Sequence, residues 1–99
     1  MPMDEIKRAD IVLSIAGRDQ GRAFAALSAE DGFAAIADGR LRRIERPKRK
    51  KLKHLKKLGV CGGPAGEKLA NGETPTNREL WHAVSGYMVL DGGDRDAQG

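Results

Sequence analysis

The chain has 99 residues, a formal net charge of +4 and an isoelectric point near 9.5, and its length suits one small domain. Its single cysteine, Cys61, excludes an internal disulfide framework and a cysteine-based zinc site, and it fits a reducing cytoplasm. No apolar run approaches the roughly 18 residues needed to cross a bilayer. The N-terminal residues also lack the apolar core of a signal peptide, so we expect a cytoplasmic protein without a membrane partner.

The first predicted element is a strand. Residues 1–9 are expected to be a short polar lead-in, and the pattern of residues 11–15 then predicts a strand with Ile11, Leu13 and Ile15 on one face. The two glycines within residues 16–21 predict a turn directly after this strand.

Residues 22–38 leave two alternatives open. Their seven alanines favour a helix by intrinsic propensity. The break at residues 30–32 instead leaves two pieces short enough to be strands, at about 23–29 and 33–37. Asp38 and Gly39 then predict a hairpin-type turn into residues 41–45.

The basic residues are concentrated in the next segment, 40–57. It holds eleven Lys and Arg residues and one acidic residue, Glu45, whereas the rest of the chain holds seven basic and thirteen acidic residues. A focused positive field favours a polyphosphate partner, because each neutralised phosphate releases condensed counterions. The alternative is a solvated or disordered charge run. Apolar residues at spacings that a folded element can use weigh against it: Leu41, Ile44, Leu52, Leu55 and Leu58.

Within this segment, residues 48–57 fit either a last strand or a short helix. Leucines recur every three residues, which suits a helical turn, but Leu52 and His54 also alternate with lysines, which suits a strand. The glycine-rich stretch 59–73 is expected to be a connector with one helical turn at 67–70.

A capping box formed by Thr76 and Glu79 predicts the C-terminal helix. We expect this helix over about 77–88, within a unit of residues 74–90. Its apolar stripe consists of Leu80, Ala83, Val84 and Tyr87. Residues 91–99 are expected to be a disordered tail.

The sequence shows no arrangement typical of an enzyme. Residues 62–68 superficially resemble a phosphate loop, but Glu67 interrupts the Gly-Lys pair and no hydroxyl follows it, so a linker is the better interpretation. Nucleophilic catalysis by Cys61 would need a positioned base, and the sequence offers only two histidines, His54 and His82. These histidines are not at the spacing of metal ligands. No pair of acidic residues stands out as a general acid and base. We therefore expect no catalysis, cofactor, metal or small-molecule substrate.

Five segments in this order carry a family resemblance: DIVLSIAGRDQGR at 10–22, ADGRLRR at 37–43, PKRKKLKHL at 47–55, GEKL at 66–69 and TNREL at 76–80. The first resembles a KOW motif, which is a hydrophobic strand, a glycine-centred turn with basic residues and a following strand. Together the segments resemble bacterial KOW-domain RNA-binding proteins related to the large-subunit ribosomal proteins of the fourteen-e type. The resemblance covers about residues 9–87.

The resemblance implies a mainly β fold: a small SH3-like β-barrel of about five strands over residues 10–58, followed by the short C-terminal helix. It also implies strands in the alanine-rich region, and RNA as partner, either ribosomal RNA or the large ribosomal subunit. We expect a monomer. The chain departs from the family pattern where alanines replace bulkier β-branched residues, and the C-terminal helix is then expected to help cover the barrel: Ala23, Ala25, Ala26, Ala34, Ala35 and Ala37.

The positions that match the family's turn and basic segment are the candidate RNA-binding residues. Arginines would clamp phosphates bidentately, and lysines would act as point charges. The two glycines either allow close approach of RNA or serve only the tight turn. No interleaved aromatics of the kind that stack bases are present, so the expected contacts are mainly to phosphate and sugar. The candidates are Gly17, Arg18, Gly21, Arg22, Arg40, Arg42, Arg43, Lys48, Arg49, Lys50, Lys51, Lys53 and His54, and Asp19 also matches the turn.

Two other function classes remain open on the sequence. A protein-interaction adaptor would dock a partner through the barrel edge or through the apolar stripe of the C-terminal helix. A basic peripheral-membrane element would use residues 48–57, although these have few apolar residues and no aromatic anchor.

Overall fold

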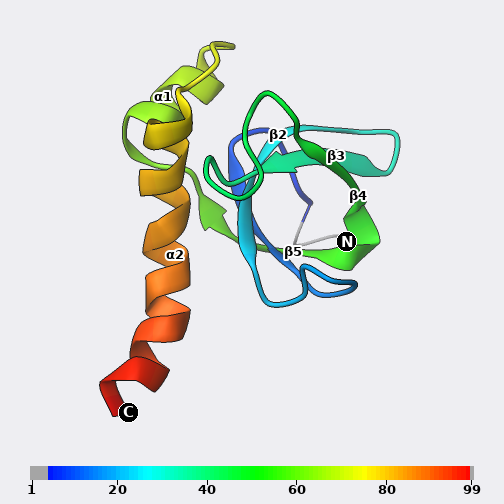
Figure 1. The fold of residues 1–99 in the computed structure, drawn as a ribbon. Coiled ribbons are helices and arrows are strands. Elements are labelled where there is room, and N and C mark those ends of the chain that lie inside the picture. Colours follow the sequence, from blue (N-terminus) through cyan, green and yellow to red (C-terminus); the bar gives the residue numbers. More distant parts are fainter. Residues whose placement is uncertain (1–4, 99) are drawn as a thin grey trace.

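The computed structural model describes residues 5–98 and the side chains of residues 5–87. The described chain is mainly β, with two α-helices at its C-terminal end (Figure 1). Its elements in order are β1 Asp10–Ser14, β2 Ala23–Glu30, β3 Phe33–Ala37, β4 Lys48–Lys51, the 3-10 turn η1 Leu52–His54, β5 Leu55–Val60, α1 Gly63–Ala70 and α2 Asn77–Gln98.

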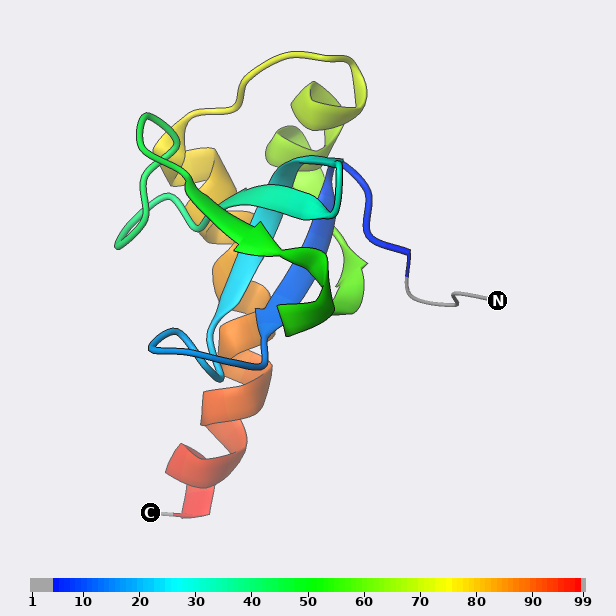
Figure 2. The same cartoon turned by 90° about the vertical axis from the view of Figure 1, so that its right-hand side faces the viewer.

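The five strands form one antiparallel sheet in the order β4-β3-β2-β1-β5. The sheet is strongly curved, but β4 and β5 are its two edges and η1 joins them without pairing them (Figures 1 and 2). The predicted mainly β fold of five strands is confirmed. The sheet does not form a closed barrel, and two helices follow it instead of one. The sheet stays open because its edge strands do not pair with each other: β5 pairs only with β1, and β4 pairs only with β3.

Both faces of the sheet are buried. The face toward the helices contains Ile11, Ala25 and Ala37, which pack with α1 and α2. The concave face contains a second cluster: Ile6, Val12, Phe24, Ala26, Ala34, Ile36 and Leu55. The predicted strand is present as β1, but it buries side chains on both faces, with Ile11 and Val12 in different clusters. Ile15 lies beyond the end of β1 and is 44% exposed.

The alanines of β2 and β3 make room for α2 on the sheet. Ala23, Ala25 and Ala37 lie in the same buried cluster as Leu80 and Val84, both of which are fully buried. Larger β-branched side chains at these positions would hold the helix away from the sheet. The expectation that the C-terminal helix covers the sheet is confirmed, and the apolar stripe of this helix is used in the core.

The N-terminal residues are more than a polar lead-in, which corrects the expectation for the part of 1–9 that the structure describes. Ile6 and Ala9 are buried. The Arg8 guanidinium donates to the carbonyl oxygens of Leu69, Leu27 and Glu73 at 2.7, 2.8 and 3.1 Å. It therefore ties the end of α1 and the chain after it to β2. Residues 1–4 of the predicted lead-in lie outside the described residues.

The alanine-rich region forms the two predicted strands, β2 and β3, but residues 41–45 form no strand. They belong to a connection, 38–47, in which side chains take the backbone N–H groups that a ladder would use. The Asp38 carboxylate accepts from the N–H groups of Arg40 and Arg42, and the Asn77 side-chain oxygen accepts from Ile44. The Asp-Gly turn is present, but it begins a long connection instead of a tight hairpin.

Three further segments differ from their predicted bounds. Residues 48–57, left open between strand and helix, contain both, as β4, η1 and the start of β5. The expected connector 59–73 includes the end of β5 and the whole of α1, whose first turn is favoured by Pro64. Helix α2 begins as predicted but continues through 91–98, the expected disordered tail, since each added residue extends the backbone hydrogen bonding of a formed helix. Gly99 lies outside the described residues.

Candidate nucleic-acid interface

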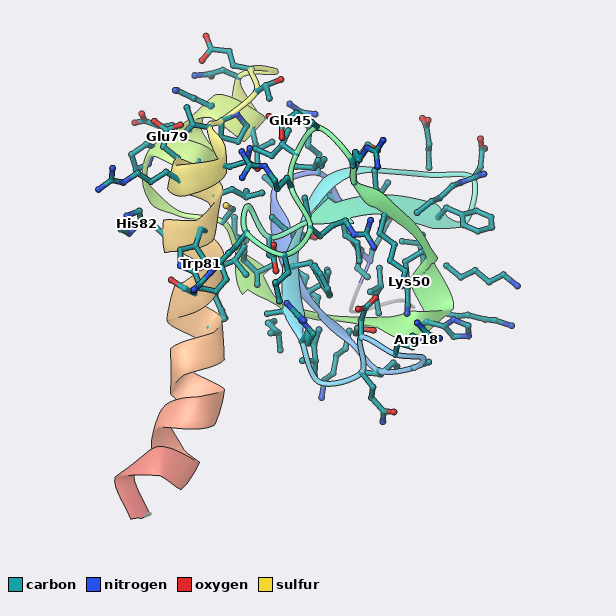
Figure 3. All side chains as sticks on the ribbon, viewed as in Figure 1. Arg18, Glu45, Lys50, Glu79, Trp81 and His82 are labelled. Carbon is teal, nitrogen blue, oxygen red and sulfur yellow. The ribbon has the colours of Figure 1, made fainter. Side chains whose placement is uncertain are left out.

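The glycine-containing loop 15–22 is attached to β4 and η1 at three points. The Ile15 N–H donates to the His54 carbonyl oxygen at 2.9 Å, and the Lys50 ammonium donates to the Ala16 carbonyl oxygen at 2.8 Å. Lys48 forms an ion pair with Asp19. Figure 3 shows Arg18 of this loop beside Lys50 of β4. The fold therefore joins two basic segments that are separated in sequence by the whole β2–β3 hairpin.

The turn geometry explains the two glycines of the loop. Gly17 and Gly21 have φ angles of +81° and +90°, which favour glycine. The Gly21 N–H donates to the Ser14 carbonyl oxygen at 2.8 Å, and the Ser14 N–H donates to the Arg22 carbonyl oxygen at 2.9 Å. Both glycines are therefore explained by the tight turn, which also orients Arg18.

Lys48 and Lys50, predicted to contact RNA, hold the loop in place. Lys50 is only 8% exposed, and its ammonium group is directed at the loop. The hydrogen bond from Lys48 is the main cause that holds the pKa of the Asp19 carboxyl below its ordinary value of 3.8. These two lysines therefore contribute to the shape and field of the surface more than to direct contact.

Other predicted cations around the loop are open to solvent. Arg18, Lys51 and Lys53 are exposed, as is Lys56, which was not among the predicted residues. Within the described residues these four side chains make no ion pair or hydrogen bond to the protein. His54 is half-buried, with its carbonyl oxygen bonded to the loop. These four cations therefore contribute accessible charge to this surface.

Three predicted arginines lie over aromatic rings. Arg49 lies 4.1 Å from the centroid of Phe33, Arg40 lies 5.2 Å from the Trp81 ring, and Arg22 lies 5.9 Å from the Phe24 ring. The electrostatic attraction between a guanidinium and an aromatic face restrains each side chain while leaving hydrogen-bond donors available. The aromatic partners of these arginines were not identified from the sequence.

The remaining predicted residues lie in the connection 38–47, which is next to the loop but distinct from it. Arg22, at the end of the loop, forms an ion pair at 3.3 Å with Asp38, at the start of the connection. The loop and the connection project from the same side of the sheet, opposite the N-terminal segment (Figure 2). The predicted single site is therefore two adjoining basic loops, one containing Arg18 and one containing Arg40, Arg42 and Arg43.

Sequence reasoning missed the uncharged and acidic residues that organise these loops. Asp38 was recognised only as a turn residue, yet its carboxylate is fully buried and accepts hydrogen bonds from three donors. Asn77, in the first turn of α2, bonds to Ile44 and to Glu45. The Asp-Gly pair signalled a turn, but nothing local indicated that Asn77, 38 positions after Gly39, would complete it.

The single cysteine lies outside these loops and is buried. Burial raises the pKa of the Cys61 thiol, so the thiol stays protonated. The described residues contain no group of three or more His, Cys, Asp or Glu side chains that could hold a metal ion. Among the described helices, none is long and apolar enough to cross a membrane.

No family model matches the chain, and a search of curated proteins finds none that is similar to it. A functional proposal for this protein therefore depends on its own residues.

Proposed function

We propose that this protein is a cytoplasmic RNA-binding module of the SH3-like KOW type, which binds ribosomal RNA or the large ribosomal subunit and has no catalytic activity. The observation that supports this most directly is the attachment of loop 15–22 to β4 and η1 by Lys48, Lys50 and the Ile15 amide. It assembles a fixed basic surface before any ligand arrives. A preorganised surface loses less conformational entropy on binding than a flexible polybasic arm does.

The charge arrangement fits a phosphate backbone. Arg18, Lys51, Lys53 and Lys56 are exposed cations, while Asp19, the acidic residue of the loop, is already engaged by Lys48. This pairing offsets the one carboxylate of the loop that would repel phosphate. This arrangement leaves a net positive field directed to solvent.

One of the two surfaces through which a protein-interaction adaptor would dock a partner is not available. The stripe of α2 that would dock a partner protein is directed into the core, where Leu80 and Val84 are fully buried. The sheet has two edges. The edge strand β4 has four residues, all of them basic, and a short charged strand disfavours pairing with an added strand. The edge strand β5 carries a register irregularity opposite Ile11 and Val12. A bulge of this kind disfavours pairing with an added strand.

Charge reversal at two exposed lysines tests the proposal. We expect the double variant Lys51→Glu/Lys53→Glu to weaken binding to ribosomal RNA fragments by roughly tenfold or more in low salt, because it replaces two phosphate contacts with repulsion. The parent should lose affinity as salt rises, with a log–log slope of roughly −0.7 to −0.9 per neutralised phosphate, and the variant should show a shallower slope. Filter binding or fluorescence anisotropy measures both.

Lys7→Glu is the matched control, because Lys7 is exposed at the opposite end of β1 from loop 15–22. It makes the same change of net charge as the single variant Lys51→Glu, but away from the proposed surface. Equal losses for Lys7→Glu and Lys51→Glu would show that only net charge matters. The absence of any RNA binding by the parent in low salt would refute the proposal.

A further inference from the structure

The connection 38–47 is a rigid loop built around a buried carboxylate. Asp38 accepts hydrogen bonds from the N–H groups of Arg40 at 2.8 Å and Arg42 at 2.9 Å, and it pairs with Arg22. The N–H groups of Asp38 and Gly39 donate in return to the Arg42 carbonyl oxygen at 2.8 and 3.1 Å. The loop therefore holds its shape without a ligand.

Helix α2 supports the second half of this loop. The Asn77 side-chain oxygen accepts from the Ile44 N–H at 2.8 Å, and the Asn77 side-chain nitrogen donates to both carboxylate oxygens of Glu45, at 3.0 and 3.1 Å. This hydrogen bond is the main cause that lowers the pKa of Glu45 below its ordinary value, so Glu45 is an anionic acceptor near neutral pH.

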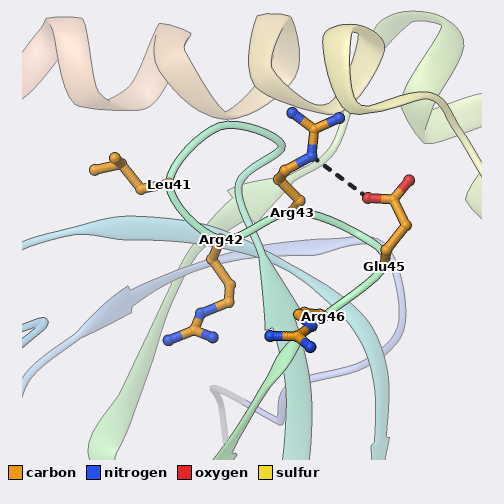
Figure 4. A pocket seen from close by; sticks show the side chains of 5 residues that line it. All are labelled: Leu41, Arg42, Arg43, Glu45 and Arg46. Atoms are coloured by element: carbon orange, nitrogen blue, oxygen red, sulfur yellow. Dashed lines mark ion pairs between the residues drawn. The ribbon is translucent and has the colours of Figure 1, made fainter.

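All the cationic residues of this loop are arginines, whereas those of β4 and η1 are mostly lysines. A shallow cavity of about 470 Å³ is lined by Leu41, Arg42, Arg43, Glu45 and Arg46. Arg42 and Arg46 point to the same side of the loop, whereas Arg43 turns toward α2 and pairs with Glu45 at 3.6 Å (Figure 4). Among the described residues, Arg42 and Arg46 make no ion pair or side-chain hydrogen bond.

The chemistry of this lining differs from that of a plain phosphate-binding surface. The Glu45 carboxylate is held by Asn77 and paired with Arg43, and its remaining lone pairs can accept from a ligand that presents N–H donors. Guanidinium planes stack on nucleobases and bind phosphate bidentately, and the 69% exposed side chain of Leu41 offers apolar contact. A cavity of several hundred cubic ångströms is also in the usual size range for a small ligand group.

We propose that the loop 38–47 binds one unpaired nucleotide of the RNA. Arg42 and Arg46 stack on its base and bind its phosphate, and the Glu45 carboxylate accepts a hydrogen bond from an amino group of the base. This inference rests on the proposed RNA-binding function and adds a class of RNA to it: a helix with a bulged or looped nucleotide. The lysine surface would then bind the backbone of the adjoining helix. Cytosine suits Glu45 best, since carboxylates accept from its amino group.

The test compares a fully paired RNA hairpin with the same hairpin carrying one bulged cytidine or one bulged uridine. We expect the bulged-cytidine hairpin to bind roughly tenfold more tightly than the paired one, in line with the usual contribution of base stacking. The variant Arg42→Lys/Arg46→Lys keeps the charge and removes the planar groups, so it should lose this preference while binding the paired hairpin as the parent does. Glu45→Gln should reduce the preference for cytidine over uridine.

Arg78→Lys is the control, because Arg78 is an exposed arginine of α2 that does not line the cavity, and it should keep the bulge preference. Circular dichroism and thermal unfolding verify that each variant is folded. If the parent binds paired and bulged hairpins equally, or if Arg42→Lys/Arg46→Lys retains the preference, the inference is wrong and the RNA-binding proposal stands. If the parent binds none of the hairpins in low salt, the proposed function fails as well.

Discussion

Two buried charged residues, Asp38 and Lys50, set the shape of the proposed interface. Burial of a charge is unfavourable unless polar partners replace its hydration, and both residues have such partners. Asp38 is surrounded by two backbone N–H groups and the Arg22 guanidinium, and Lys50 donates to the Ala16 carbonyl oxygen. Each residue therefore orients a loop whose exposed cations are available to a ligand.

Glycine at position 39 is required by the close approach of α2 to the loop. Gly39 has a φ angle of +85°, and a Cβ there would collide with the Asn77 carbonyl oxygen and lie 2.9 Å from the Trp81 amide nitrogen. We expect Gly39→Ala to lower the free energy of unfolding by roughly 2 kcal/mol more than Gly32→Ala, which shares a positive φ but has open space around it. Urea unfolding of both variants measures the difference, and equal losses would contradict the steric explanation.

The pair of Asp19 and Lys48 makes stability depend on pH. Because the pKa of Asp19 is lowered in the folded state, its contribution is fully present above the unfolded value, near 3.8, and is lost as pH falls through the folded value. We expect Asp19→Asn to reduce the free energy of unfolding at pH 7 and to match the parent in strong acid. Denaturant unfolding across this range checks it, with Glu30→Gln as the control at an exposed carboxylate that has no ion pair in the described chain. A loss that is equal at all pH values would exclude the ion pair as its cause.

At the scale of elements, the small residues of β2 and β3 and the apolar stripe of α2 are complementary. The strands alternate between the concave face, which contains Phe24 and Ile36, and the helix face, which contains Ala25 and Ala37. Bulky residues thus fill the curve of the sheet, and small ones admit the helix. This difference between the two faces explains why β2 and β3 contain so many alanines, which are unusual in strands.

Docking of α2 should account for a large part of the stability. We expect Leu80→Ala to lower the free energy of unfolding by about 3 kcal/mol, because Leu80 is fully buried between helix and sheet. The same substitution at Leu41, which is 69% exposed, should change it by less than about 0.5 kcal/mol. Thermal or denaturant unfolding compares the two variants. A small effect of Leu80→Ala would mean that the sheet is stable without the helix.

At the scale of the whole molecule, elements with a clear periodicity or cap were predicted correctly. The strand at β1 and the start of α2 were found from alternation and from the Thr76–Glu79 capping box, whose two hydrogen bonds are present at 2.9 and 3.1 Å. The short elements η1 and α1 were not resolved, because their pattern is compatible with several structures. The candidate site was partly predictable, since its cations are conspicuous in the sequence.

The sequence alone determined where the charge is concentrated and where β1 and the start of α2 lie, because composition, alternation and capping are local properties of the chain. Tertiary structure alone decided which cations face solvent. Lys50 and Lys51 are neighbours in sequence, yet one is buried against loop 15–22 and the other is exposed. The physical reason is that successive residues of a strand point to opposite faces, and only the folded sheet determines what covers each face.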